Sequence, residues 1–233
     1  MTHVADNLEA VRERILEACR RAGRDPDSVR LLPVSKTHGH ELIEEAYAAG
    51  ARTFGENRVQ EAKGKAEQFA DRADLSWALI GHLQTNKAKD VVTFAEEFHA
   101  LDSIKVARAL DRHLQDLGRT LDVFIQVNSS AEPQKFGLAP AEVEQFAHDL
   151  VPLGTLRVRG LMTLAVFSED EQAVRRCFQR MVDLQRLLRG SNAPGSYEEL
   201  SMGMSGDFEL AIEYGATTVR VGEAIFGTRK PYA

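Results

Sequence analysis

Cysteine, excess positive charge and long apolar runs are all scarce in this sequence of 233 residues. Its two cysteines, Cys19 and Cys177, each lie within a helical pattern, which argues against a disulfide framework and for a reducing, cytoplasmic setting. Lysine and arginine number 29 against 35 aspartates and glutamates, so the net charge of −6 makes nucleic acid an unexpected partner. No apolar run is long enough to span a bilayer, and residues 1–6 lack the basic and apolar regions of a secretory signal, so no membrane association is expected.

The sequence does contain a regular alternation of strand and helix patterns. Hydrophobic residues make up 43% and charged residues 27%, the balance of an ordinary globular protein. A helical repeat between Val4 and Ala18, stopped by Gly23, opens the chain. Strands are then predicted at residues 29–35, 52–55, 76–81, 98–101, 122–128, 158–164, 199–202 and 218–221. Helices are predicted between them at residues 40–49, 58–69, 86–94, 104–117, 140–150, 174–188 and 208–214.

Eight alternating units without a linker predict an α/β fold, a single (β/α)8 TIM-type barrel with an additional N-terminal helix. We expect one domain over residues 1–233, with the opening helix packed on its own barrel and the chain a monomer. An open doubly wound sheet is the alternative. Two features count against a closed barrel: Pro33 is awkward inside a central strand, and the helix at residues 58–69 is unusually polar.

Lys36 is the first candidate functional residue, because it follows the first predicted strand. The carboxyl ends of the strands form the active face of such a barrel. In an apolar site the pKa of a lysine falls toward neutrality, and a neutral amine can attack a carbonyl and form a Schiff base. The competing interpretation, favoured by this stretch alone, is a surface lysine that caps a strand.

The segments after the last two strands have the composition of a phosphate cradle. Residues 201–207, Ser-Met-Gly-Met-Ser-Gly-Asp, combine glycines that allow close backbone approach with hydroxyl donors, and Gly222 and Glu223 follow the final strand. A phosphate site shared by these two loops recurs in this fold. An ordinary glycine-bearing turn is the alternative interpretation.

Arg220 lies within the last predicted strand, where a charged side chain needs a partner. A carboxylate such as that of Asp207 or Glu223 is one interpretation. The other is a bound heterocycle, to whose ring nitrogen arginine can donate without losing its own proton. The His38-Gly39-His40 triplet has no acidic or cysteine neighbours in sequence, and we interpret it as a turn and helix start rather than a metal site.

These residues occur within a longer set of ordered motifs that resembles the pyridoxal phosphate homeostasis protein family along nearly the whole chain. The motifs are Val34-Ser35-Lys36-Thr37, Phe54-Gly55-Glu56-Asn57, Gly81-His82-Leu83-Gln84 with Asn86-Lys87, Val127-Asn128, Lys135-Phe136-Gly137-Leu138, Gly160-Leu161-Met162-Thr163, Leu200 to Ser205 with Asp207, and Val219-Arg220-Val221-Gly222. The family is related to the amino-terminal barrel of alanine racemase. The resemblance therefore implies a barrel that binds pyridoxal 5′-phosphate (PLP) in a fold-type III site.

The resemblance also implies roles for residues at the matching positions. Lys36 would hold PLP as a Schiff base. Ser201 and Gly222 would hold the phosphate, with Ser205 and the backbone of Glu223 as further contacts.

Other matching positions concern the ring of the cofactor. Arg220 would face the pyridine nitrogen, and Asn57 and Met162 would border the ring. Lys135 matches a family lysine with an implied part in cofactor handling.

Two functions fit such a site: a carrier that sequesters PLP or delivers it to apo PLP-dependent enzymes, and a PLP-dependent enzyme similar to amino-acid racemases. The resemblance implies that the racemases have a second, β-rich domain with a catalytic tyrosine, whereas this sequence ends at Ala233, soon after the eighth strand. Arg220 would leave the pyridine nitrogen unprotonated and the ring a weak electron sink. We therefore expect a non-catalytic carrier involved in PLP homeostasis. A Schiff-base aldolase without cofactor is a third interpretation.

Overall fold

The eight strands of residues 3–228, the part of the chain that the computed structural model describes, form one parallel sheet. They are β1 (Arg30–Pro33), β2 (Thr53–Glu56), β3 (Ser76–Leu79), β4 (Ala95–Leu101), β5 (Leu121–Val127), β6 (Leu156–Thr163), β7 (Glu199–Ser201) and β8 (Thr218–Val221). Neighbours pair in the order β1-β8-β7-β6-β5-β4-β3-β2, and every ladder is parallel. The predicted (β/α)8 barrel is confirmed.

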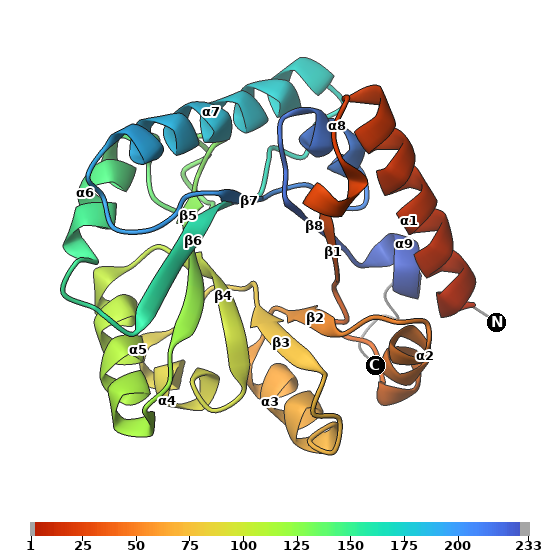
Figure 1. Ribbon diagram of the computed structural model, residues 1–233, viewed down its shortest axis with the longest axis horizontal. Coiled ribbons are helices and arrows are strands. Elements are labelled where there is room, and N and C mark those ends of the chain that lie inside the picture. Colours follow the sequence, from red (N-terminus) through yellow and green to blue (C-terminus); the bar gives the residue numbers. More distant parts are fainter. Residues whose placement is uncertain (1–2, 229–233) are drawn as a thin grey trace.

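Helices lie on the outside of the strands (Figure 1). They are α1 (Val4–Arg21), α2 (His40–Ala48), α3 (Val59–Gln68), α4 (Ala88–Val91), α5 (Ile104–Leu117), α6 (Val143–Asp149), α7 (Glu171–Gly190), α8 (Phe208–Glu213) and α9 (Glu223–Phe226). Short 3-10 turns cover Pro26–Ser28, Thr85–Lys87 and Pro140–Glu142. None of the helices in residues 3–228 has both the length and the apolar character needed to cross a bilayer.

The barrel is nearly closed, with a seam between β1 and β2. These strands meet at one bridge, Val34 to Gly55, where the Ser35 N–H donates to the Gly55 carbonyl over 3.1 Å. Pro33 occupies the last position of β1 and has no N–H to donate, while the next residue, Val34, donates to Val221 of β8 over 2.9 Å. Since successive N–H groups of a strand point to opposite sides, the missing donor faces the β2 side, which reconciles Pro33 with a strand.

The opening helix packs on its own barrel, as predicted. One face of α1 is buried, with Val4, Leu8, Val11 and Ile15 at helical spacing. This face contacts α2, α8 and α9, so the first helix covers the last βα units (Figure 1). Burying a stripe of aliphatic side chains stabilises this docking by several kcal/mol, at about 25 cal/mol per Å².

Several elements differ from their predictions: β1 and β3 end two residues earlier than expected, and α7 begins three residues earlier. Strand β4 begins three residues earlier than expected, at Ala95, and α4 is a single turn rather than a helix over residues 86–94. The β-branched pair Val91-Val92 ends that helix, because such residues lose side-chain freedom in a helix. The four-residue α9 after β8 was not predicted, since it is too short to show a helical period.

Candidate functional site

Lys36 lies at the carboxyl end of β1, beside the end of β8. Leu32 pairs with Arg220 and Pro33 with Val221, so β1 and β8 are in register up to the mouth of the barrel. At Gly222 a Cβ atom would lie 3.0 Å from the Val34 carbonyl oxygen, which shows how closely the two strand ends approach. Lys36 is half-buried two residues beyond Val34.

Ser35, the residue before Lys36, is held by a buried ion pair. Its hydroxyl donates to Glu56 Oε1 over 2.6 Å, and its carbonyl accepts from Lys65 Nζ over 2.8 Å. Lys65 also donates to Glu56 over 2.6 Å, although neither side chain is more than 5% exposed. Burial raises the pKa of the Glu56 carboxyl, against the opposing effects of Lys65 and Ser35.

Thr37, the residue after Lys36, is held by Glu61 of the same helix as Lys65. Its N–H donates to Glu61 Oε1 over 2.5 Å, and Lys65 Nζ donates to the same oxygen over 2.8 Å. The backbone of Thr37 is left-handed, with φ of 66°, a conformation that non-glycine residues adopt only when their surroundings impose it. Helix α3 therefore fixes both neighbours of Lys36.

Arg220 is buried inside the barrel and binds neutral oxygen atoms. Its side chain is 3% exposed, and it donates to Ser201 Oγ and to the Thr163 carbonyl, each over 2.7 Å. Within residues 3–228 it forms no ion pair. Burial lowers the pKa of Arg220 to about 10, with Asp207 opposing the shift, so the guanidinium remains charged near pH 7.

The hydrogen bonds continue from Ser201 across the barrel to β4. Ser201 Oγ lies 2.9 Å from Nδ1 of His99, whose Nε2 lies 2.7 Å from Glu97 Oε2. Arg30 of β1 clamps the same carboxylate through two contacts of 2.5 and 2.7 Å. We call Glu97, His99, Ser201 and Arg220 the Glu97–Arg220 network.

Protonation within this network is fixed by its surroundings. Burial alone would raise the pKa of Glu97, but the hydrogen bonds from Arg30 and His99 outweigh it and hold the pKa well below its ordinary value. Burial lowers the pKa of His99, against the pull of Glu97. The carboxylate is therefore ionised and the imidazole neutral near pH 7.

The loops after β7 and β8 meet at the mouth. Ser205 Oγ lies 3.4 Å from the N–H of Ala224 in the first turn of α9, which places Ser205 beside the backbone of Gly222 and Glu223. The first of these loops turns at Gly203, where φ is 94° and a Cβ atom would lie 2.7 Å from that of Ala211. These two loops are where the sequence predicts the phosphate.

Asn57 and Met162 lie at the ends of two further strands. Asn57 follows β2 and is half-buried, and its backbone packs so closely on Gly81 that a Cβ atom there would lie 2.1 Å from the Asn57 carbonyl oxygen. Met162 is fully buried and pairs with Ser201 in the β6–β7 ladder. Both are therefore at the mouth end of their strands, on either side of β1, β7 and β8.

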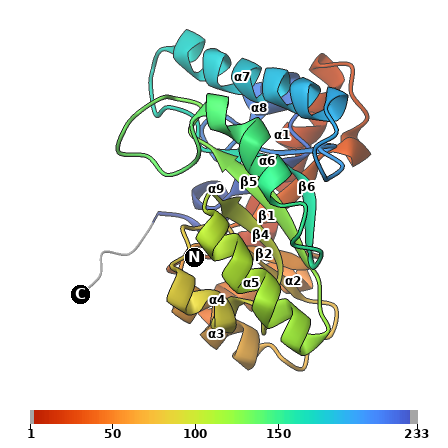
Figure 2. The ribbon, with the colours of Figure 1, turned by 90° about the vertical axis from the view of Figure 1, so that its left-hand side faces the viewer.

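Lys135 lies in the loop between β5 and α6, which extends away from the strands in Figure 2. Its Nζ donates to the Ala165 carbonyl after β6 over 3.0 Å and pairs with Glu132 over 2.5 Å. The neighbouring Phe136 stacks on His82, with ring centroids 4.1 Å apart. The loop after β5 therefore contacts the segments that follow β3 and β6.

The His38-Gly39-His40 triplet begins α2, and both rings lie on aromatic neighbours. His38 stacks on Phe226 with centroids 5.3 Å apart, and His40 is tilted against Phe69 at 6.0 Å. In the part of the chain that the structure describes, no group of three or more His, Cys, Asp or Glu side chains is arranged to hold a metal ion.

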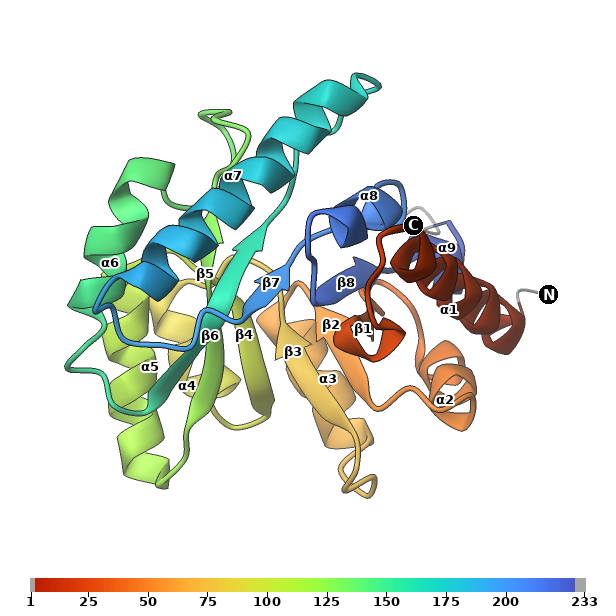
Figure 3. The ribbon, with the colours of Figure 1, turned by 45° about the horizontal axis from the view of Figure 1, so that its top comes forward.

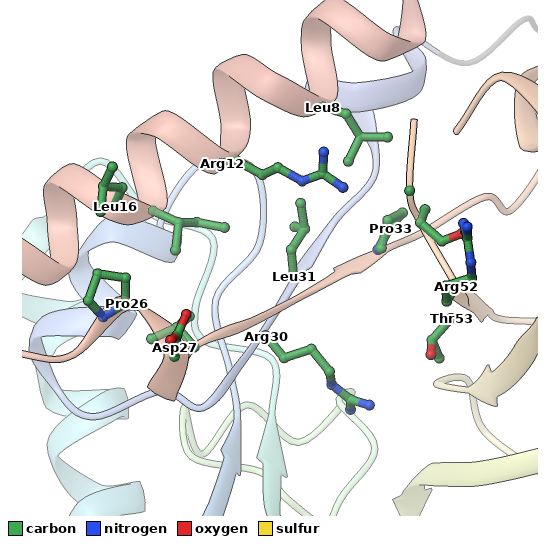
Figure 4. Close-up of a pocket in the computed structure, with 14 residues that line it drawn as sticks. Leu8, Arg12, Leu16, Pro26, Asp27, Arg30, Leu31, Pro33, Arg52 and Thr53 are labelled. Atoms are coloured by element: carbon green, nitrogen blue, oxygen red, sulfur yellow. The ribbon is translucent and has the colours of Figure 1, made fainter. Parts of the chain in front are cut away.

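A separate cavity of about 460 Å³ lies away from the mouth, at the seam between β1 and β2. It is lined by Leu31 and Pro33 of β1, Thr53 of β2 and Leu8 and Arg12 of α1 (Figure 4). Its other residues include the amino end of β1, opposite to Lys36. It is a gap left by the open seam, distinct from the predicted site.

The structure brings the predicted residues to one end of the barrel and adds others that the sequence did not reveal. The additions are Glu97, His99, Glu61 and Lys65. A signal existed for Lys65, which continues the buried spacing of Val59 and Ala62 in α3. For His99 the signal was a polar residue inside a strand whose neighbours are apolar.

The chain matches the family described as "Alanine racemase, N-terminal domain" over residues 7–230. A curated relative from Pseudomonas aeruginosa, named pyridoxal phosphate homeostasis protein, is 42% identical over 98% of this chain and 97% of its own length. The structure of PipY from Synechococcus elongatus PCC7942 with PLP bound is 38% identical, covers 96% of this chain and 100% of that one, and has a TM-score of 0.82. Alanine racemase from Clostridium difficile 630, 16% identical with a TM-score of 0.72, shares the fold over 100% of this chain and 58% of its own.

Proposed function

This chain belongs to the pyridoxal phosphate homeostasis protein family, within the wider family of the alanine racemase N-terminal domain, and from that premise we propose that it is a PLP carrier. It binds PLP as a Schiff base on Lys36, sequesters the cofactor or delivers it to apo PLP-dependent enzymes, and does so without catalytic turnover. Curated relatives have the homeostasis name, and PipY holds PLP on the same fold.

The residues at the mouth fit PLP. The observation that supports this most directly is the β1–β8 ladder, which puts an amine, Lys36, and a buried guanidinium, Arg220, on adjacent strand ends. Among the described residues, Arg220 has neutral oxygen partners and no bonded carboxylate, which suits a ligand atom that accepts a hydrogen bond. Ser205 and Gly222 converge where a phosphate is expected, and Ser201 lies at the last residue of β7, bonded to Arg220.

In this proposal each residue has a defined task. The contacts to Ser35 and Thr37 would keep the Lys36 amine at the mouth, where it would hold the aldehyde carbon of PLP with release of water. Ser205 and the backbone of Gly222 and Glu223 hold the phosphate. When bound, PLP would supply an electrophilic carbon and an electron-withdrawing ring.

The ring of the cofactor would meet three other residues. Arg220 donates to the pyridine nitrogen, and Asn57 and Met162 border the ring. Lys135, held by Glu132 and the Ala165 carbonyl, takes part in handling the cofactor at the rim.

The absence of turnover is supported by the chemistry of Arg220. A guanidinium with a pKa of about 10 keeps its proton near pH 7, so the pyridine nitrogen accepts a hydrogen bond and the ring withdraws electrons weakly. Racemisation also needs a base on each face of the substrate carbon. Of the tyrosines in residues 3–228, Tyr47 binds Asp74, Tyr197 binds the Pro194 carbonyl and Tyr214 lies under Arg175.

We also propose a cytoplasmic, monomeric protein of one domain over residues 1–233. Two buried free cysteines, Cys19 and Cys177, support a reducing compartment. The docking of α1 onto its own barrel supports the monomer, because it leaves that apolar face covered.

The test uses the purified full chain and the variant Lys36→Ala. We expect PLP to give the wild type a visible absorbance band and, after borohydride reduction, a mass adduct on the peptide that contains Lys36. Both should be lost in Lys36→Ala, while Lys135→Ala should keep them. Absence of the band and adduct in the wild type would refute the PLP assignment. Exchange of the α-proton of amino acids well above the rate with free PLP would instead favour a racemase-like enzyme.

A further inference from the structure

Two strands on opposite sides of the barrel are joined through buried hydrogen bonds that the proposed function leaves unused. The Glu97–Arg220 network runs from β4 through β7 to β8, and His99 at its centre is fully buried, with its ring 4.1 Å from that of Phe124. Ser201 is also fully buried. Burying a histidine, a glutamate and an arginine in one barrel costs free energy unless each has partners. An arrangement this costly indicates a functional role.

The direction of each hydrogen bond in the network follows from the protonation states. An ionised Glu97 can only accept, so His99 Nε2 carries the proton between them. The neutral imidazole then has a lone pair on Nδ1, and the Ser201 hydroxyl must donate to it. The same hydroxyl oxygen accepts from Arg220. Every donor therefore points toward Glu97.

On this basis we propose that Ser201, His99 and Glu97 are positioning residues that orient the Arg220 guanidinium toward the ring nitrogen of bound PLP, and that Ser201 serves Arg220 rather than the phosphate. The inference rests on the proposed function. The hydroxyl of serine has one proton, and a neutral His99 that donates to Glu97 accepts it at Nδ1. Ser201 thus has no proton left to donate to a phosphate oxygen, whereas Ser205 has.

The network also explains how a buried cation is held without a direct ion pair among the described residues, with only Asp207 near enough to act on it electrostatically. Glu97 acts on Arg220 through two intervening groups, and hydrogen bonds in series polarise one another. A carboxylate in direct contact with Arg220 would compete with the ligand for its N–H groups. The neutral Ser201 oxygen fixes one terminal nitrogen and leaves the guanidinium able to donate elsewhere, since arginine has five N–H groups.

The distinguishing experiment compares PLP with pyridoxal, which has the same ring and aldehyde but no phosphate. For Ser201→Ala we expect the Kd of both ligands to rise by the same factor, about tenfold, the size expected for a lost charge-assisted hydrogen bond. The absorbance maximum of bound PLP should also shift, because the ring nitrogen loses a well-aimed donor. Ser205→Ala is the matched control: it should weaken PLP alone and leave the Kd of pyridoxal unchanged.

A second background tests whether Ser201 acts through Arg220. In Arg220→Gln, adding Ser201→Ala should change neither Kd further, since residues that act through one another are not additive. Should Ser201→Ala fail to fold, His99→Gln takes its place, because glutamine can still donate to Glu97 but offers no acceptor at the Nδ1 position. The conservative variant Ser201→Thr keeps the hydroxyl and should retain both affinities.

Three results would overturn the inference: loss of PLP affinity alone in Ser201→Ala, unchanged affinity for both ligands, or a full additional loss in the Arg220→Gln background. Wild-type protein that binds neither PLP nor pyridoxal would instead refute the proposed function, and the inference with it. The two failures are therefore separable.

Discussion

Two buried cations lie at this barrel mouth, and they are stabilised in different ways. Lys65 is paired directly with the carboxylates of Glu56 and Glu61, at 2.6 and 2.8 Å. Within residues 3–228, the direct partners of Arg220 are neutral oxygen atoms. A direct pair immobilises the cation, which suits a residue that holds the backbone, whereas neutral partners leave a guanidinium free to bind a ligand.

The ionisation of the Glu97 carboxylate predicts how the free energy of unfolding changes at acidic pH. Its pKa is held below the ordinary value in the folded protein, so its contribution to stability is complete above the unfolded pKa of about 4.5 and is lost as pH falls further. Glu97→Gln should lower the free energy of unfolding at pH 7 by at least about 2 kcal/mol, since it removes the charge that Arg30 and His99 bind. Urea denaturation at several pH values measures the difference from the wild type, which should shrink below about pH 4.5.

Glu96 in the same strand provides the control for this substitution. Its carboxylate pairs with Arg119 over 2.6 Å but is 55% exposed. Glu96→Gln should change stability little at any pH, because exposed ion pairs contribute weakly. A pH-independent loss in Glu97→Gln would show that packing, not charge, is what Glu97 provides.

Site residues at strand ends, and Arg220 as a charged residue within an apolar strand, could be predicted from the sequence, whereas the polar residues of β4 and α3 were missed. Lys36 and Ser205 follow apolar runs, where a polar residue is exposed to the mouth of any such barrel. Glu97 and His99 belong to β4, whose mixed sequence hides which side chains point inward. The contact between His99 and Ser201 joins residues about a hundred positions apart, and Glu97 is linked to Ser201 only through His99, which no local pattern encodes.

At the scale of elements, α3 is the helix whose role was hardest to predict from its sequence. It is polar, yet Val59, Ala62 and Lys65 recur at helical spacing and all three are buried. The helix therefore packs on the barrel through a stripe that includes a lysine, and that lysine reaches the backbone of Ser35 beside Lys36.

Lys65→Met tests the role of α3. The substitution leaves Glu56 buried without its cation, and we expect the free energy of unfolding to fall by about 3 kcal/mol, as for other broken buried pairs. Because the Ser35 carbonyl loses its donor and Glu61, which holds Thr37, loses its cation, the rate at which Lys36 reacts with PLP should fall as well. Urea denaturation and stopped-flow absorbance measure the two effects.

Lys63 of the same helix is the matched control. It pairs with Asp90 over 2.8 Å, but the two side chains are 41% and 36% exposed. Lys63→Met should leave both stability and the rate of PLP binding close to those of the wild type. Equal effects of the two substitutions would mean that Lys65 has no special link to the Lys36 segment.

Most elements of the fold were predictable because their periods are strong. The pattern predicted α5 and β8 with their observed bounds, since Gly118 and the turn at Gly222 end them sharply. The single turn α4 and the early start of β4 were not predictable from local patterns. Figure 3 shows α7, another strongly periodic helix, crossing outside the strands as expected for a βα unit.

For the whole molecule, the important feature is that the proposed site lies across the seam. Lys36 belongs to the β1 side and Asn57 to the β2 side, and the two strands share one bridge. The order β1-β8-β7 places Arg220 and Ser205 next to Lys36. A ligand that contacts all of these residues would add to the connection between the two edges of the sheet at the mouth, beside the single bridge that joins them.

PLP should therefore stabilise the entire barrel, and most of all its seam. At a free PLP concentration 100-fold above Kd, linkage adds about 2.7 kcal/mol to the free energy of unfolding, which corresponds to a rise in Tm of about 5–10 °C for a protein of this size. Differential scanning calorimetry measures the rise, and hydrogen exchange should show the added protection concentrated at the Ser35 amide, which bonds to Gly55 across the seam.

Pyridoxine 5′-phosphate separates tethering from simple occupancy, because it has the ring and the phosphate but no aldehyde. Compared with PLP, it should give a smaller rise in Tm in the wild type, and in Lys36→Ala the two ligands should become equivalent. Amides of the β5–β6 ladder, far from the seam and continuously paired, should show only the global change. If PLP raised Tm but protected both regions equally, the ligand would stabilise the barrel without bridging its edges, and the location of the site across the seam would be wrong.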